Sequence, residues 1–354
     1  MAASSKFDDT INYRVTPFGR SLPGHPGGDI PPSVGRFRVL DQLASGGMGV
    51  VLRAYDDTLD REVALKVSAG GPRAGHEPRV LGRFHHPGII AVHEAGTLGD
   101  GRGYFAMPLV EGRTLSALLV ARPSPAADLA RWLRVFERVC RAVKHAHGRG
   151  IVHRDLKPSN VMVGPGDRPH VLDWGVAGEA GAADESGHCV CGTPAYMAPE
   201  QFRPTVADPR TDVFGLGAML CEILTGDAPY VGLVPAAVTL RATEADQQEV
   251  RGRLARSGAP AALVRLVEDC LAPDLALRPA DAGEVAGRVA DYLAGAEGLT
   301  VAAPPVAERH VGGVFAATAL AIACVLAAIT MPKLRAHPAP PPVPAAVGPP
   351  ITTG

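Results

Sequence analysis

The chain has no excess of charge of either sign. Its 354 residues include 35 Lys and Arg against 36 Asp and Glu, which gives a formal net charge of −1. A protein without a global basic field is not expected to bind nucleic acid through bulk electrostatics. We therefore expect no nucleic-acid partner.

The marks of a secreted protein are also missing. No signal peptide opens the sequence, and the six cysteines are not spaced as a disulfide framework. These two observations favour a reducing compartment.

Apolar periodicity is absent from both ends of the chain. Residues 1–35 are rich in Pro, Gly, Ser and Asp, which predicts a flexible leader. Residues 331–354 form a Pro-rich tail that we expect to be unstructured. The overall hydrophobic content of 46% is nevertheless high enough to build a real core between these ends.

A regular pattern runs through residues 36–295, which we interpret as one folded domain. Strand-like apolar runs come first, at residues 37–40, 50–54, 62–67 and 104–107. Helical periodicity dominates later, at residues 129–147, 212–224, 261–271 and 282–293. Strands followed by helices predict an α+β fold with a small β-rich lobe and a larger helical lobe.

Residues 311–330 contain no charged side chain. A helix of this length spans about 30 Å, the thickness of the hydrocarbon core of a bilayer. We therefore expect a transmembrane helix here, joined to the domain by a linker over residues 296–310. A buried helix of the globular domain is the alternative, although the domain pattern ends before it. Small residues at Ala316, Ala319 and Ala323 are compatible with a homodimer through this helix.

The octapeptide at residues 153–160 carries the strongest chemical signal. It places a carboxylate at Asp155, an ammonium at Lys157 and an amide at Asn160. Phosphoryl transfer from ATP to a hydroxyl needs a carboxylate to orient the hydroxyl, a cation to offset phosphoryl charge, and an oxygen ligand for the metal. The octapeptide therefore predicts a reaction rather than only a fold.

With this octapeptide, the chain resembles the protein kinase superfamily, and specifically the eukaryotic-like Ser/Thr kinases of bacteria, over residues 37–293. The resemblance implies a bilobal protein kinase fold, with ATP and Mg²⁺ as cofactors and Ser/Thr-bearing proteins as substrates. Asp155, Lys157 and Thr193 would be catalytic, with Thr193 bonding Asp155 and Lys157. Asn160 and Asp173 would bind the metal.

A Gly-rich loop resembles the family segment that covers the phosphates. Ala44 replaces the first family glycine, which should weaken the fit only modestly because its Cβ is small. A Gly-rich hairpin turn that binds no nucleotide would show the same residue pattern. The loop residues implied as ATP contacts are Leu43, Ala44, Ser45, Gly46, Gly47, Met48, Gly49, Val50 and Val51.

Lys66 resembles the family lysine that binds the α- and β-phosphates while paired to a glutamate on the next helix; a surface lysine on a strand is the alternative. Glu77 is the best candidate for that glutamate, although Pro78 follows it and only eleven positions separate it from Lys66. Because proline is tolerated only in the first turn of a helix, we expect a truncated helix that begins near Glu77. The pairing of the two residues is a hypothesis.

Several further segments match the family pattern. Met107 resembles the gatekeeper of the hinge, where the backbone of Pro108 and Val110 would bond adenine; an ordinary strand end is the alternative. Trp174 stands after Asp173 where the family usually has Phe, and we interpret it as a bulkier apolar plug. The resemblance also implies structural roles for three residues, namely a buried ion pair of Glu200 with Arg278 and a brace of the catalytic loop by Asp212.

The segment between Gly175 and Thr193 carries one hydroxyl, Ser186. The residue before Asp155, Arg154, is one that in the family often receives a phosphorylated group, so Ser186 is a candidate for autophosphorylation. Residues 188–191 read His-Cys-Val-Cys, for which a metal or redox switch and two inert thiols both remain open.

Three classes of function compete. A membrane-tethered Ser/Thr protein kinase is favoured, because Lys66, Asp155, Asn160 and Asp173 are all present. A pseudokinase acting as an ATP-binding scaffold and a small-molecule phosphotransferase are the alternatives. Positive charge flanks both ends of residues 311–330 and does not fix the orientation. ATP chemistry does, so we expect a single-pass protein of the cell membrane with its kinase domain in the cytoplasm.

Overall fold

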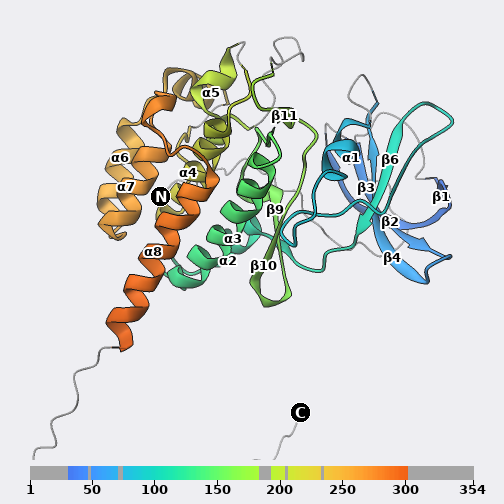
Figure 1. The fold of residues 1–354 in the computed structure, drawn as a ribbon, viewed down its shortest axis with the longest axis horizontal. Helices are drawn as coiled ribbons and strands as arrows, with labels where there is room; N and C mark the ends of the chain where they lie inside the picture. The colour runs from blue at the N-terminus through green and yellow to red at the C-terminus, as the bar shows by residue number, and fades with distance from the viewer. Residues whose placement is uncertain are drawn as a thin grey trace, which may run out of the picture. The chain divides into compact units, whose positions relative to one another are not determined.

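The computed structural model describes residues 31–46, 49–70, 75–182, 193–203, 206–232 and 235–301. All of these residues belong to one compact unit that ends at Val301. Within this unit, a sheet-rich lobe and a helical lobe follow one another along the chain (Figure 1). The predicted α+β, bilobal architecture is therefore confirmed.

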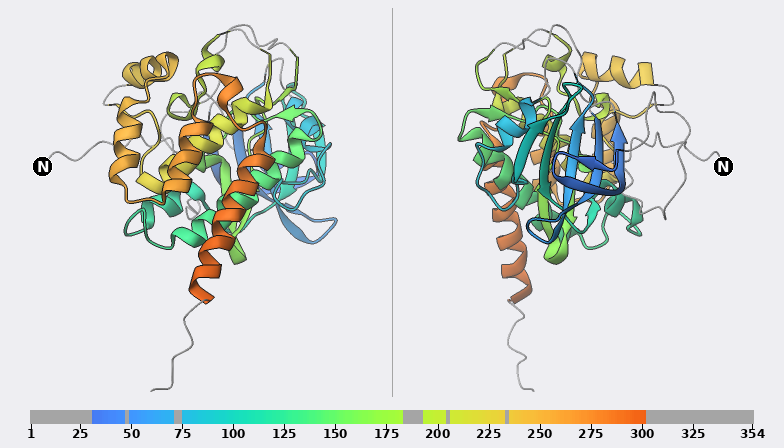
Figure 2. Two further views of the ribbon diagram at one scale, coloured as in Figure 1. Left: turned by 60° about the vertical axis from the view of Figure 1, so that its left-hand side comes forward. Right: turned by 90° about the vertical axis from the view of Figure 1, so that its right-hand side faces the viewer.

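The first lobe is a six-stranded antiparallel sheet (Figures 1 and 2). Its strands in spatial order are β1 (Ser33–Val34), β2 (Phe37–Gly46), β3 (Gly49–Asp56), β4 (Arg61–Ser68), β6 (Gly103–Pro108) and β5 (Glu94–Thr97). One face of the sheet carries a small core of its own that includes Val34, Leu65 and Tyr104. The opposite face contributes Ala64, Phe105 and Met107 to the large core of the helical lobe.

A short helix, α1 (His76–Leu81), lies between β4 and β5 in the chain. Gly75 precedes it with a φ of 86°, a left-handed conformation that glycine adopts without strain. Pro78 falls in the first turn, where its missing N–H costs no helical hydrogen bond. The predicted truncated helix near Glu77 is therefore confirmed.

The second lobe is built from seven helices in its described residues, packed around α4. These are α2 (Leu115–Ala121), α3 (Leu129–His147), α4 (Pro209–Thr225), α5 (Pro235–Glu244), α6 (Gln248–Arg256), α7 (Ala261–Cys270) and α8 (Ala282–Val301). Every residue of α4 from Thr211 to Leu224 is buried, so this helix has no solvent-facing stripe. Asp208 caps its first turn by accepting a hydrogen bond from the Arg210 N–H, and Gly226 ends it with a φ of 88°.

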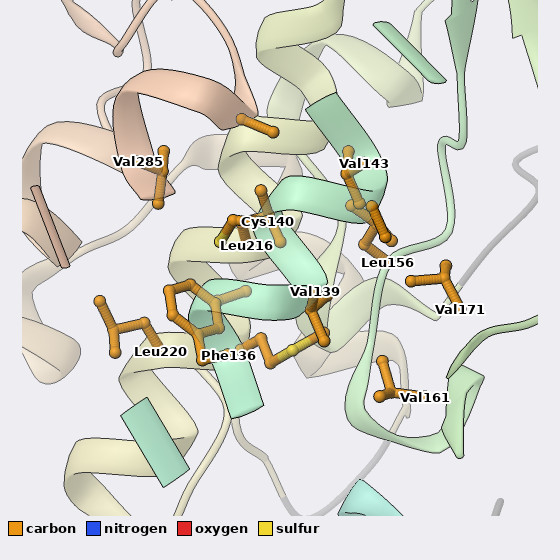
Figure 3. Close-up of a cluster of buried hydrophobic side chains, with 14 of the residues drawn as sticks. Phe136, Val139, Cys140, Val143, Leu156, Val161, Val171, Leu216, Leu220 and Val285 are labelled. Carbon is orange, nitrogen blue, oxygen red and sulfur yellow. The ribbon is translucent and has the colours of Figure 1, made fainter. Parts of the chain in front are cut away.

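The core of this lobe lies where α3, α4 and α8 meet. Figure 3 shows Phe136 of α3 beside Leu220 of α4, and Cys140 of α3 beside Leu216 of α4. Val285 of α8 belongs to the same core. Three free cysteines, Cys140, Cys221 and Cys270, are buried among the described residues of this lobe.

Short strands and 3₁₀ turns carry the segments with the predicted chemistry. Two small sheets have the orders β10-β9-β7 and β11-β8. Their strands are β7 (Arg113–Thr114), β8 (Ile151–Val152), β9 (Val161–Gly164), β10 (Arg168–Val171) and β11 (Gly178–Glu179). The 3₁₀ turns are η1 (Pro158–Asn160), η2 (Pro165–Asp167), η3 (Pro194–Tyr196), η4 (Pro199–Phe202) and η5 (Leu275–Leu277).

The domain extends slightly beyond the predicted limits at both ends. Ser33 and Val34, placed in the leader by sequence, pair with β2 because Val34 is buried in the small core. Helix α8 continues to Val301, so residues 296–301 of the predicted linker are helical. Ala, Leu and Glu in this stretch are good helix formers, and its one glycine, Gly298, weakens a helix without ending it.

In the part of the chain that the structure describes, no helix is both long enough and apolar enough to span a bilayer. The predicted transmembrane segment 311–330 lies outside the described residues. Residues 1–30 of the leader and the tail at 331–354 lie outside them too, and these assignments stay predictions.

Candidate active site

The Gly-rich segment forms the hairpin between β2 and β3. Gly46 pairs with Gly49 at the end of the hairpin, and Gly49 has a φ of 137°. A Cβ at Gly49 would overlap the carbonyl oxygen of Val67 on β4, whereas a Cβ at Gly46 would meet nothing within 4 Å. Gly49 is therefore required by close backbone approach, and Gly46 is not.

The side chains of the predicted nucleotide contacts in this hairpin lie on both faces of the sheet. Leu43 and Val51 pack against the large core together with Val110. Val50 packs on the opposite face of the sheet with the small core, so its side chain points away from those of Leu43 and Val51. Alternation of side chains along a strand explains the difference. Ala44 pairs with Val51 and is buried, Ser45 is exposed, and Gly47 and Met48 lie outside the described residues.

Lys66 forms ion pairs with two carboxylates. Its Nζ lies 2.6 Å from Glu77 Oε2 and 2.7 Å from Asp173 Oδ1. Helix α1, although short, therefore places Glu77 where the pairing hypothesis requires it. The backbone N–H of Trp174 also bonds to the Glu77 carboxylate, which ties α1 to the segment around Asp173.

Lys66, Glu77 and Asp173 are largely shielded from water. Burial disfavours the charged form of each side chain, whereas the opposite charge of its neighbour favours it. Burial lowers the pKa of Lys66, but Asp173 and Glu77 outweigh it and the pKa is raised above its ordinary value. Burial raises the pKa of Glu77, and the nearby Asp173 carboxylate acts in the same direction. Burial acts to raise the pKa of Asp173 as well, but the positive charge of Lys66 outweighs burial, and the pKa of Asp173 is lowered. Asp173 is therefore held as a carboxylate, the form that binds a hard cation.

Asp155 is the centre of the second cluster. Its Oδ2 lies 3.1 Å from Lys157 Nζ and accepts a hydrogen bond from Asn160 Nδ2 at 3.0 Å. Its Oδ1 accepts from the backbone N–H of Thr193 at 3.3 Å. Lys157 Nζ in turn donates to Thr193 Oγ1 at 2.6 Å. The structure thus brings together all the predicted catalytic residues and Asn160.

A buried aspartate on α4 holds the backbone of this cluster. Asp212 accepts hydrogen bonds from the backbone N–H groups of His153 and Arg154, both at 2.8 Å. It also lies 2.9 Å from His147 Nε2, and both side chains are almost fully buried. His147 Nδ1 accepts the N–H of Ala282, the first residue of α8, at 3.5 Å. The predicted brace by Asp212 is present, and His147 is a partner that sequence reasoning missed.

The ion pair of Glu200 with Arg278 is also formed. Arg278 donates to both carboxylate oxygens of Glu200, at 2.7 and 2.9 Å, and its side chain is 0% exposed. The same guanidinium donates to the backbone oxygens of Ala272, Arg210 and Pro273. The pair fixes the segment after Thr193 on the helical lobe.

The predicted hinge follows the end of β6. Met107 is buried in the large core and pairs with Ala64, and Pro108 pairs with Val63. Leu109 and Val110 pack against the same core. The location between the sheet and α2 fits the prediction, since this is where the chain passes from one lobe to the other (Figure 1).

A cavity of about 540 Å³ lies beside α1, in a place that the sequence analysis did not anticipate. Lys66, Glu77 and Gly175 line one side, and Ser68, Gly96 and Tyr104 belong to its sheet side. The spacing of only eleven positions from Lys66 to Glu77 was the signal in the sequence for this cavity. It leaves room for a short helix, and a helix of six residues covers little of the sheet.

Several expectations concern segments outside the described residues. Ser186 and the His-Cys-Val-Cys run at 188–191 are among them. Within the described ranges, no group of three or more His, Cys, Asp or Glu could hold a metal ion. Asp173 and Asn160 stay the predicted metal ligands.

Comparison with known proteins gives evidence on the family of this chain that does not depend on the structure. A family model described as protein kinase domain matches residues 37–286. The chain is 38% identical over 210 residues to the DNA damage-responsive serine/threonine-protein kinase RqkA of Deinococcus radiodurans, which covers 56% of the chain and 31% of that protein.

Two other similar proteins are bacterial as well. The serine/threonine-protein kinase pkn3 of Myxococcus xanthus is 35% identical over 269 residues, covering 70% of the chain and 48% of that protein. The serine/threonine-protein kinase PknL of Mycobacterium tuberculosis is 36% identical over 289 residues, covering 78% and 70%. The chain thus spans less than half of the first two relatives and over two thirds of the third.

Proposed function

This chain belongs to the protein kinase family, and to its eukaryotic-like bacterial Ser/Thr branch, and we propose that it transfers the γ-phosphoryl group of ATP to serine and threonine hydroxyls of proteins. One observation carries the proposal. The Asp155 carboxylate is held by Asn160, Lys157 and Thr193. The charge of Lys157 also acts on Asp173, which pairs with Lys66 at 2.7 Å, so the two clusters belong to one site.

Each residue has a distinct part in this reaction. Asp155 orients the attacking hydroxyl and accepts its proton. Lys157, tied to Thr193 at 2.6 Å, places positive charge beside the transferred phosphoryl group. Lys66, fixed by Glu77, meets the α- and β-phosphates, while Leu43 and Val51 offer an apolar surface to the base.

The residues present fit a magnesium ion. Asp173 is an ionised carboxylate and Asn160 an amide, and oxygen ligands of these two types suit Mg²⁺. The ion would supply neutralising charge on the phosphate oxygens when bound. Lys66 Nζ lies 2.7 Å from Asp173 Oδ1, so the lysine and the metal would share one carboxylate.

The test is transfer of radiolabelled phosphate from ATP to the protein itself or to a generic basic protein. We expect transfer by the full-length wild type and a loss of at least ~10³-fold for Asp155→Asn, because the variant has no base. Asp155→Asn should still bind ATP, which equilibrium dialysis would measure. ATP binding without transfer by the wild type would contradict the proposal and favour an ATP-binding scaffold.

We also propose that the protein is tethered to the cell membrane through residues 311–330, with the kinase domain in the cytoplasm. The support is the sequence alone, which has no charged residue in this stretch. Membrane fractions should retain the wild type after alkaline carbonate extraction, and two arginines introduced at Ala319 and Ala323 should release it. Release of the wild type by carbonate would contradict the tether.

Autophosphorylation at Ser186 is a further part of the proposal. It rests on the sequence, since Ser186 is the one hydroxyl between Gly175 and Thr193. Mass spectrometry of the wild type after incubation with Mg·ATP should find phosphate on Ser186, and Asp155→Asn should lack it. Undiminished activity in Ser186→Ala would remove any regulatory need for this phosphate.

A further inference from the structure

The connection between α1 and β5 makes a turn that rests on the helical lobe. In this turn the Ile89 N–H donates to the His86 carbonyl at 3.0 Å. The Gly88 carbonyl accepts from the N–H of Val171, the last residue of β10, at 2.8 Å. A Cβ at Gly88 would come within 3.0 Å of the Ala142 Cβ on α3. The turn therefore lies directly against two elements of the helical lobe.

The side chain of His86 completes this turn. Its Nδ1 lies 3.0 Å from the backbone nitrogen of Gly88. Because a backbone N–H can only donate, this Nδ1 accepts the hydrogen and carries no proton of its own. The neutral imidazole therefore has its proton on Nε2. A protonated His86 would present a donor to the Gly88 donor, and the bond would be lost.

His145 of α3 faces the same turn. The ring centroids of His86 and His145 are 5.0 Å apart. Nδ1 of His145 lies 3.2 Å from a guanidinium nitrogen of Arg149, which can only donate, so this Nδ1 is unprotonated as well. The other ring nitrogen of His145, Nε2, is buried and has no hydrogen-bond partner among the described residues. The arrangement thus suits two neutral imidazoles.

The charged groups that act on the two rings are basic. Arg149 acts on both rings, and His85 acts on His145. Arg83, which follows α1, exchanges hydrogen bonds with Arg149, since each guanidinium donates to the other residue's carbonyl, at 3.2 and 3.0 Å. The Glu179 carboxylate on β11 pairs with Arg83 at 2.7 Å. In the part of the chain that the structure describes, no carboxylate is paired with either ring.

Burial and these positive neighbours lower the pKa of both His86 and His145. A histidine in an unfolded or loosened segment has a pKa of about 6.5. The loosened contact therefore takes up protons more readily than the closed one. The closed contact is fully favoured above about pH 6.5 and loses ground as the pH falls from there through the lowered values.

We propose that His86 and His145 form an acid-sensitive contact between the two lobes, which is closed while both imidazoles are neutral and opens when either takes up a proton. Opening releases the Gly88 turn from α3 and loosens one connection between the lobes. ATP would contact both lobes, Lys66 from one and Asp173 from the other, so its affinity should fall when the contact opens. This last step rests on the proposed function, whereas the opening itself does not.

The first measurement is amide hydrogen exchange of the unmodified full-length protein at pH 7.5 and pH 5.5, corrected for the intrinsic effect of pH on exchange. The protection of the peptide that contains Gly88 should fall by about 3- to 10-fold, since one proton shifts an equilibrium by at most about 10-fold one pH unit below a pKa of about 6.5. A peptide from α7, which contains no histidine, should keep its protection. A Gly88 peptide that keeps its protection, or that changes only in step with α7, would overturn the proposal. No residue is substituted, so this measurement decides even if variants do not fold.

The second measurement compares the affinity for Mg·ATP at the two pH values in the wild type and in His86→Asn/His145→Asn. The Asn Oδ1 takes the place of Nδ1 as an acceptor and does not titrate. Protonation of ATP itself affects both proteins alike. The loss of affinity at pH 5.5 should be smaller in the variant by roughly 2- to 12-fold, the range that the net strength of one hydrogen bond corresponds to. An equal loss in the two proteins would overturn the link to ATP binding.

His93 supplies the matched control. It stands in the same connection, directly before β5, and burial lowers its pKa as well. Its charged neighbours are Arg61 and Asp56 of the sheet-rich lobe instead. His93→Asn should therefore keep the acid-induced loss of the wild type, and an equally reduced loss in this variant would contradict a special role of the contact. A wild type that binds no ATP at pH 7.5 would refute the proposed function, while exchange at Gly88 would still decide whether the contact opens.

Discussion

Lys66 and Glu77 form an ion pair of 2.6 Å although the helix that carries Glu77 is only six residues long. The short spacing along the chain is compensated by the position of Glu77 in the first turn, two residues after Gly75. Both side chains are only 12% exposed, so neither charge is well solvated. The pair is therefore sensitive to loss of either partner.

Replacing Lys66 by Met should make stability depend on pH in a new way. In the wild type Lys66 lowers the pKa of Asp173, so this carboxyl contributes stability above its unfolded pKa and loses it as the pH falls through its folded pKa. Without Lys66, burial alone raises the pKa of Asp173 and of Glu77. Their contribution is then present below about pH 4 and is lost as the pH rises through the raised values.

The Tm deficit of Lys66→Met relative to wild type should therefore be larger at pH 8 than at pH 5. At pH 8 we expect the free energy of unfolding to be lower than that of the wild type by about 3–5 kcal/mol, the cost of an uncompensated buried charge. Calorimetry at the two pH values checks this. The control is Lys144→Met, which removes a more exposed pair with Asp281 and should cost at most about 1 kcal/mol. An equal deficit at both pH values would show that the carboxylates are solvated.

Arg278→Met should be among the most destabilising substitutions in the helical lobe. It leaves the Glu200 carboxylate without its bidentate partner and removes donors from three backbone carbonyls. We expect a loss of about 3–5 kcal/mol in the free energy of unfolding. Arg288→Met is the matched control, because Arg288 pairs with Asp269 at the same 2.7 Å but both partners are at least 35% exposed. Its cost should stay within about 1 kcal/mol in urea denaturation, and similar losses in the two variants would argue against a special role of burial.

Thr193→Val should slow phosphoryl transfer without weakening ATP binding. The variant keeps the shape and the backbone N–H that bonds Asp155, but it loses the hydroxyl that accepts from Lys157. Lys157 then keeps only its contact with Asp155 at 3.1 Å and is held less firmly beside the reacting group, so we expect kcat to fall by about 10- to 100-fold. Thr193→Ser keeps the hydroxyl and should retain most activity. If Val and Ser behave alike in steady-state kinetics, the hydroxyl is not what positions Lys157.

Two alanine substitutions in the Gly-rich hairpin should have opposite outcomes. Gly49→Ala forces a Cβ against the Val67 carbonyl at a φ of 137°, and we expect a cost of about 1–3 kcal/mol in folding and weaker ATP binding. Gly46→Ala meets no neighbour and should be tolerated in stability. Thermal unfolding and ATP titration of both variants check the pair of predictions. Equal tolerance would mean that the hairpin shifts away from β4.

The chemistry of the site could be predicted from the sequence because the reaction demands fixed residue types at fixed offsets. Asp155, Lys157 and Asn160 were assigned in this way, and the structure brings them into contact. Helix α3 was predicted with its observed bounds, 129–147, since one face is buried and its apolar residues recur at helical spacing. Helix α4 begins three residues before its predicted start, at Pro209, because the cap at Asp208 sets its first turn.

Other features could not be predicted because they depend on contacts distant in sequence. His147 is one histidine on a helix, and only folding brings it to Asp212, 65 positions later. The side-chain direction of Val50 depends on how β3 lies in the sheet, where Val50 pairs with Val67 of β4. The indole N–H of Trp174 donates to the Val171 carbonyl, a bond that requires the position of Val171, so the sequence indicated an apolar plug and not a directional bond.

The contact between Ala282 and His147 has a practical consequence for protein production. The first N–H of α8 reaches Asp212 through one imidazole, and Lys144 bonds to Asp281 on the same helix–helix boundary. A shortened fragment that stops before residue 281 would lose this link and expose the α3 surface that α8 covers. Purification trials should therefore place the cut after α8 rather than at the last recognisable motif.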